Sequence, residues 1–126
     1  MNQSGVIKTV ASNITQILFN TQNFISVSIV CGDTGITANA DGKKVIPAGT
    51  PMKGSIQARG TAFTKGDDET AVGVLLHDVD VTYQGKGNGT LLLFGAVNLD
   101  RLDSTTKALF TADMIEHLDK IFFLKD

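Results

Sequence analysis

The chain contains little cysteine, proline or tryptophan. Its 126 residues include one cysteine (Cys31), two prolines and no tryptophan. A single cysteine excludes an intrachain disulfide and a zinc site built from several cysteines. No apolar run approaches the roughly 20 residues of a membrane-spanning helix, and the polar segment Met1–Lys8 has no secretory signal pattern. We therefore expect folding in a cytoplasm and no membrane partner.

An excess of positive charge is also absent. The chain has 11 Lys and Arg against 13 Asp and Glu, a formal net charge of -2. Proteins that grip nucleic acid need clustered basic residues, so we expect no nucleic-acid partner. The hydrophobic content of 42% is typical of a globular protein. A chain of this length forms one domain and buries roughly two-thirds of its surface.

Alternating apolar residues predict a mainly β fold. The segment Phe24–Cys31 is rich in β-branched residues, which favour strands. One face of this strand is expected to carry Ile25, Val27, Ile29 and Cys31. Residues 1–23, rich in Asn, Gln, Ser and Thr, are interpreted as an extended N-terminal arm. Residues 24–126 then form the β-rich domain.

Turn residues divide the next part of the chain. Gly32–Gly35 and Asn39–Lys44 are predicted turns, because glycine accepts a positive φ without a Cβ clash. Val45–Ile46 follows as a short strand. Pro47 and Pro51 lack the N–H group that a sheet ladder uses, so their segment is expected at a sheet edge or in a loop.

The second half of the sequence predicts a hairpin, a helix and a last strand. Ala71–Thr82 and Thr90–Val97 are largely apolar, and the glycine-rich Gln84–Gly89 between them is the expected turn. A helix is predicted from about Ala112 to Lys120, with Thr111 as its N-cap. Its apolar stripe consists of Phe110, Met114, Leu118 and Ile121. Ile121–Leu124 is expected to return to the sheet as a strand.

Two carboxylates are a candidate cation site. Asp78 and Asp80 share one face of a predicted strand and could hold a divalent cation together. The alternative interpretation is that both face solvent or bond neighbouring backbone.

Two other patterns suggest catalysis or phosphate binding. Cys31 with His77 or His117 could form a nucleophile pair, but a cysteine on an apolar strand face is usually a small buried side chain. Gly85–Thr90 lacks the Gly-Lys-Ser/Thr ending and the following helix of a phosphate loop. We therefore expect no enzyme and no cofactor.

Three segments together resemble a known family. Asp41–Pro51 (DGKKVIPAGTP), Thr70–Thr82 (TAVGVLLHDVDVT) and Gly89–Leu102 (GTLLLFGAVNLDRL) are similar in order and spacing to the capsid decoration and head fibre proteins of tailed bacteriophages. Within the second segment, Ala71–Leu75 resembles the corresponding part of the lambda-type head decoration family. The resemblance as a whole covers about residues 39–126.

The resemblance implies a structural role in the virion. Such proteins have a compact β-rich fold of β-tulip or barrel form, with one short C-terminal helix. They assemble as homotrimers on the outer surface of the expanded capsid, bind the major capsid protein and stabilise the head against genome pressure. An N-terminal segment adds a strand to an edge of the capsid protein.

Eight residues are the expected capsid contacts. Those in the arm are Ile7, Val10, Ile14, Ile17 and Phe19, and those in the following loop are Pro47, Pro51 and Met52. For the arm residues the alternative is an ordinary core strand.

Three other functions remain open. The base of a head fibre is the nearest. A carbohydrate- or receptor-binding module would usually expose aromatic side chains, and this chain has one tyrosine and no tryptophan. A trimeric β enzyme, such as a nucleotide hydrolase, would need an acidic and glycine-rich site that the sequence does not contain.

Overall fold

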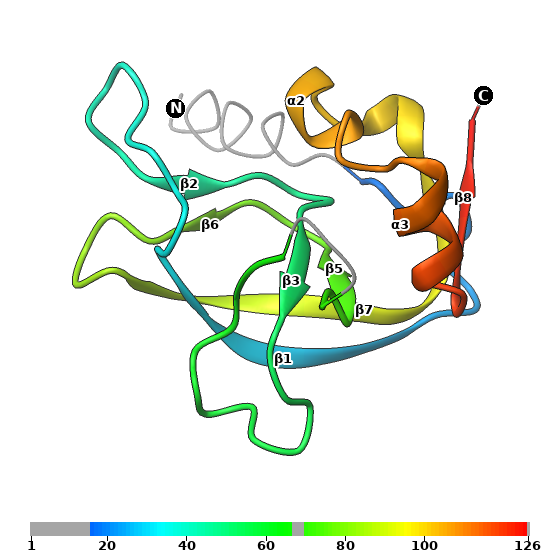
Figure 1. The fold of residues 1–126 in the computed structure, drawn as a ribbon, viewed down its shortest axis with the longest axis horizontal. Coiled ribbons are helices and arrows are strands. Elements are labelled where there is room, and N and C mark those ends of the chain that lie inside the picture. The colour runs from blue at the N-terminus through cyan, green and yellow to red at the C-terminus, as the bar shows by residue number, and fades with distance from the viewer. Residues whose placement is uncertain (1–15, 67–69, 126) are drawn as a thin grey trace, which may run out of the picture.

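The computed structural model describes residues 16–66 and 70–125, which form a mainly β structure with short helices near the C-terminus (Figure 1). The strands are β1 (Ile25–Gly32), β2 (Val45–Ile46), β3 (Pro51–Lys53), β4 (Thr64–Lys65), β5 (Gly73–Leu75), β6 (Val79–Asp80), β7 (Lys86–Asn98) and β8 (Ile121–Leu124). The helices are the 3-10 turn η1 (Leu99–Arg101), α2 (Ser104–Lys107) and α3 (Ala112–His117).

The main sheet is organised around β7. Its strand order is β1-β7-β5-β3-β4 with antiparallel neighbours, and β8 pairs in parallel with the end of β7. Strands β2 and β6 form a separate antiparallel pair.

Phe63 connects the two ends of this sheet. Its backbone N–H donates to the carbonyl of Val30 at 2.7 Å, and its own carbonyl accepts from the N–H of Gly32 at 2.7 Å. Because Phe63 directly precedes β4 and both partners lie in β1, the first and last strands of the order are joined. The main sheet is therefore barrel-like.

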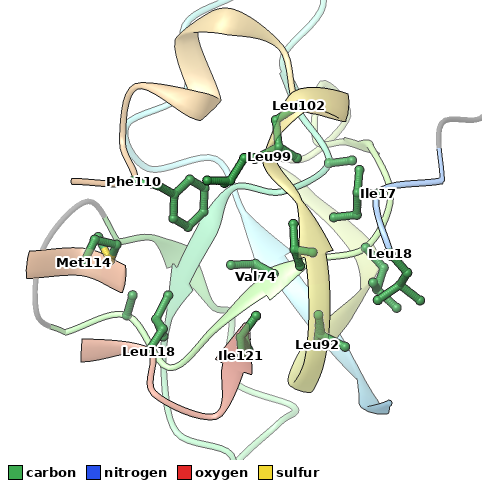
Figure 2. Packing of buried hydrophobic residues seen from close by; sticks show 14 residues of the cluster. Ile17, Leu18, Val74, Leu92, Leu99, Leu102, Phe110, Met114, Leu118 and Ile121 are labelled. Atoms are coloured by element: carbon green, nitrogen blue, oxygen red, sulfur yellow. The ribbon is translucent and has the colours of Figure 1, made fainter. Parts of the chain in front are cut away.

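Two hydrophobic cores lie on opposite sides of β7. Leu91 belongs to the core inside the sheet, with Cys31, Met52 and Phe63. The next residue, Leu92, belongs to a second core beneath the C-terminal helices, shown in Figure 2. Successive side chains of a strand point to opposite faces, so one strand supplies both cores.

Several sequence predictions are confirmed. The predicted strands at Phe24–Cys31, Val45–Ile46 and Ile121–Leu124 correspond to β1, β2 and β8. Helix α3 begins after its predicted cap, since the Thr111 hydroxyl accepts from the N–H of Met114 at 3.3 Å. The whole predicted stripe is buried: Phe110, Met114, Leu118 and Ile121.

The helical part of the chain is larger than predicted. The expected single helix is α3, which ends at His117 rather than Lys120, and η1 and α2 precede it. Helix α2 is capped by Asp103, whose carboxylate accepts from the N–H of Thr106 at 2.7 Å. An N-cap aspartate of this kind satisfies an otherwise unpaired N–H group.

The expected hairpin is wrong in its turn and in half of its pairing. Strand β5 pairs with β7, but β6 pairs with β2 instead. The turn is shorter than Gln84–Gly89, because positive φ values occur at Gln84 and Gly85 and β7 already begins at Lys86.

Gly87 and Gly89 lie inside β7 because β6 crosses it closely. A Cβ on Gly87 would lie 2.6 Å from the carbonyl oxygen of Asp80 and 2.9 Å from a methyl group of Val79. A Cβ on Gly89 would lie 2.8 Å from Cys31 Sγ. Their role is close backbone approach rather than turn formation.

The proline segment agrees with the expectation of an edge or loop except at its last residue, since residues 47–50 form the turn between β2 and β3. Pro51 is the first residue of β3, which lies between β5 and β4 within the sheet. A proline is tolerated at the start of a strand, where its missing N–H breaks no interior ladder bond. Its carbonyl still accepts from the N–H of Gly66 at 2.9 Å.

We predict that Gly87→Ala lowers the free energy of unfolding by about 1–3 kcal/mol, the usual cost of overpacking. The added methyl group must displace the backbone of Asp80, which is held by pairing with β2. Urea unfolding of both variants measures the effect. Gly60→Ala is the matched control, because nothing lies within 4 Å of its Cβ position. Equal stabilities of the two variants would contradict this account of Gly87.

Candidate functional site

Six large apolar side chains remain exposed around the end of β7 and β8, and we call them the apolar surface. They are Phe19, Phe24, Ile25, Phe94, Phe122 and Leu124. Phe122 is 62% exposed and Ile25 57% exposed. Four of the seven phenylalanines of the chain thus lie on this surface.

The centre of the apolar surface is a row across three segments. Phe19 donates its N–H to the carbonyl of Ala96 at 2.8 Å, and Ala96 is the register partner of Phe122. Directly paired residues place their side chains on the same face of a sheet. The neighbouring residues Leu18 and Val97 form a bridge and are buried. One face of this part of the sheet is therefore buried and the other is exposed.

The alternation of side chains along β7 is interrupted near Gly95. Leu92 and Val97 belong to the same core, although residues five apart in a regular strand face opposite sides. Gly95, at φ 150°, lies between them, and a Cβ there would lie 3.0 Å from Phe24 Cβ. The distortion brings Phe24 against β7, at the border of the apolar surface.

The pairing between β1 and β7 is irregular at the same place. Ile25 pairs with Phe94 and Ser26 pairs with Leu92, so Leu93 is an extra residue of β7. The sequence predicted Ile25 on the buried face with Ile29 and Cys31. Ile29 and Cys31 are buried, whereas Ile25 is exposed together with its register partner Phe94.

The predicted capsid contacts occupy different environments. Phe19 is half exposed and Pro47 is half buried. Ile17, Pro51 and Met52 are buried, so in this structure they stabilise the fold and present no surface. The other three, Ile7, Val10 and Ile14, lie outside the described residues.

The folded domain includes residues that were expected in the N-terminal arm. Ile17 and Leu18 pack in the helical core, and the N–H of Asn98 donates to the carbonyl of Ile17 at 2.8 Å. Residues 17–19 are thus part of the folded domain rather than of a separate arm ending at residue 23. The alternative of a core contact therefore describes Ile17.

The acidic pair has a structural role. Asp78 accepts from the N–H of Ala48 at 2.7 Å, and Asp80 accepts from the N–H of Thr82 at 2.9 Å. The hydrogen bonds to Thr82 lower the pKa of Asp80. No group of three or more His, Cys, Asp or Glu side chains that could hold a metal occurs within the described residues.

A shallow cleft of about 620 Å3 lies on the outer side of β1 and β7. Arg59, His77, Asn88 and Thr90 are among its lining residues. The guanidinium of Arg59 donates to the carbonyl of Ser28 at 3.0 Å, which ties the 59–60 loop to β1. The cleft is open, and its lining is mixed, with Ile29 and Val79 beside the polar side chains.

Cys31 is fully buried in the core inside the sheet. Burial raises the pKa of its thiol from 9.0 to about 11, because the charged thiolate loses its hydration. The thiol is therefore protonated at neutral pH and poorly suited to nucleophilic attack. His117 lies elsewhere, with its Nε2 atom 2.8 Å from the carbonyl of Ala71.

No protein-family model matches the sequence, and no curated protein matches it. Within the described residues, no helix has the length and apolar character needed to span a membrane. The candidate site consequently rests on the geometry of the apolar surface.

Sequence reasoning missed most of this surface. Among the predicted contacts, only Phe19 belongs to it. The available signal was the run Ile121–Leu124, which is apolar at every position. A strand with one buried face needs apolar residues only at alternate positions, so the run indicated that two apolar side chains would remain on the other face, and these are Phe122 and Leu124.

We predict that burial of Cys31 makes stability fall between pH 9 and 11. In that interval the unfolded chain loses the thiol proton and the folded chain retains it, so the free energy of unfolding decreases as pH rises. Urea unfolding across this interval should show a smaller decrease for Cys31→Ala, which has no thiol to titrate. Lysine and tyrosine titrations are common to both proteins. Parallel pH profiles would contradict the assigned pKa.

Proposed function

We propose that the protein is a non-enzymatic capsid decoration protein, which binds the outer surface of an expanded tailed-phage head. The support is the arrangement of the three segments that resemble this family. Asp41–Pro51 and Thr70–Thr82 contribute β2 and β6, which pair with each other. Thr70–Thr82 and Gly89–Leu102 contribute the pairing of β5 with β7. The segments that carry the resemblance thus form one connected framework.

The major capsid protein is the proposed partner of the N-terminal segment. Residues 1–15 carry Ile7, Val10 and Ile14 and one charged side chain, Lys8. In the proposed complex this segment adds a strand to an edge of the capsid protein, where main-chain hydrogen bonds supply affinity and alternate side chains supply specificity. The half-buried Pro47 is a second proposed contact.

Selective binding to the expanded shell would stabilise the capsid. A protein that binds the expanded shell and not its dissociated subunits stabilises the shell by mass action. Assembly as a homotrimer multiplies weak single contacts, because the second and third arms bind at a high effective concentration. The complex would resist separation of neighbouring capsid subunits under genome pressure. The virion surface is the corresponding location, after synthesis in the host cytoplasm.

A receptor- or carbohydrate-binding module on the virion is the second candidate. The observation that favours it is the exposure of aromatic side chains, which such modules use for stacking. Tyr83 is 74% exposed, and four phenylalanines lie on the apolar surface. The base of a head fibre would present the same features.

We predict that the full chain cosediments with expanded capsids of its own phage, saturating near one copy per capsid subunit. A chain lacking residues 1–15 should not cosediment, and it keeps Ile17 and Leu18 for the core. Ile14→Asp should weaken binding by about tenfold or more, since it places a charge in an apolar contact.

Asn13→Asp is the matched control for Ile14→Asp, because it introduces the same charge at the adjacent polar position. It should bind like the unaltered chain. Absence of binding by the full chain to its own expanded capsid would refute the decoration function. The receptor-binding function would then take its place.

A further inference from the structure

We propose that a second copy of this chain covers the apolar surface, so that Phe94 and Phe122 lie at an interface between identical subunits. The inference rests on the self-association contained in the proposed function and assigns a surface to it. It does not depend on binding to a capsid.

The apolar surface is continuous rather than scattered. Phe19 and Phe122 flank Ala96 on opposite sides of β7, and Ile25 pairs with Phe94 two residues earlier. Single exposed apolar residues are ordinary on a soluble protein, whereas a contiguous patch of several aromatic residues marks an interaction site.

The size of the apolar surface fits one side of a stable interface. With an aromatic side chain contributing roughly 150–250 Å2, the exposed fractions of the six side chains correspond to about 500 Å2. Each partner in a standard interface buries about 800 Å2, of which roughly 57% is apolar. The apolar part of such an interface is therefore already present on this face.

The charges around β8 favour a second copy as the occupant. Asp119 and Lys120 precede the strand and Lys125 follows it, and all three are exposed. A rim with both signs is complementary to itself, since a lysine of one copy can face the aspartate of another. A strongly acidic or basic partner would instead require a rim of one sign.

Strand β8 lacks, within its own four residues, two of the features that protect an exposed strand in a monomer, a charge and a proline. Within the described residues it pairs only with β7, so its other edge has no strand partner. Native edge strands are usually protected by a charge, a proline or a bulge, and Ile121–Leu124 contains no charge and no proline. A subunit contact would remove this hazard.

The test is the molar mass of the full chain in solution, measured by sedimentation equilibrium from about 1 to 100 μM, the range in which interfaces of this size associate. We expect an oligomer. Phe122→Ser should lower the association constant by about thirtyfold or more, the effect of truncating a central aromatic contact. Circular dichroism establishes that the variant folds, and folding is expected because Phe122 is exposed.

Tyr83→Ser is the matched control. It removes an exposed aromatic residue from the turn before β7, at the opposite end of the long axis from β8 (Figure 1). Its association constant should equal that of the unaltered chain. Hydrogen exchange in β8 provides a second measurement, because protection of this strand should decrease on dilution if the surface is buried between copies.

The outcomes separate this inference from the decoration function. An unaltered chain that stays monomeric, or a Phe122→Ser oligomer as stable as the original, overturns the inference. Loss of capsid binding by Phe122→Ser with an unchanged oligomer overturns it as well and assigns the surface to the capsid protein. An oligomer that depends on Phe122 but binds no capsid supports the inference and refutes the decoration function.

Discussion

Leu91 and Leu92 are adjacent in the chain, and both are fully buried because β7 runs between two hydrophobic cores. Burial of both side chains depends on the elements that pair with β7 and cover its two faces. Strands β1, β5 and β8 and the bridge at Leu18 all pair with β7, and the short helices cover its second face. The three-residue β5 and the four-residue β8 add directly to this long strand, and β3 and β4 join the sheet through β5. Strands β2 and β6 pair only with each other.

The apolar surface is a consequence of where this burial ends. At Leu91 and Leu92 the chain covers β7 on both faces, whereas beyond Leu93 the irregular backbone near Gly95 leaves Phe94 exposed and Val97 buried. Strand β8 extends the exposed face instead of covering it, since Ile121 packs inward and Phe122 does not. The proposed subunit partner would cover this exposed face without any change in the fold.

Local periodicity was sufficient to predict β1, β8 and α3, including the Thr111 cap, because alternation and helical spacing act within a few residues. It failed wherever distant segments approach each other. Gly87 and Gly89 look like turn residues in sequence, but the passage of β6 above β7 requires them. Pro51 looks like an edge residue because its partners, 15 or more residues away, are invisible in the local pattern. The apolar surface is likewise formed by segments far apart in the sequence. For that reason Phe19 was its one residue among the predicted contacts.

Leu18 and Phe123 both pair with Val97, so two segments from opposite ends of the described chain meet on the same three residues of β7. Contacts between such distant positions slow folding, because a long loop must close before they are gained. The helical core cannot be completed until Ile121 is available. During synthesis, the earlier part of the chain must therefore wait with its apolar residues incompletely covered. We therefore expect pairing of β8 to be a late step of folding, so that its rate limits how long the apolar residues are open to aggregation.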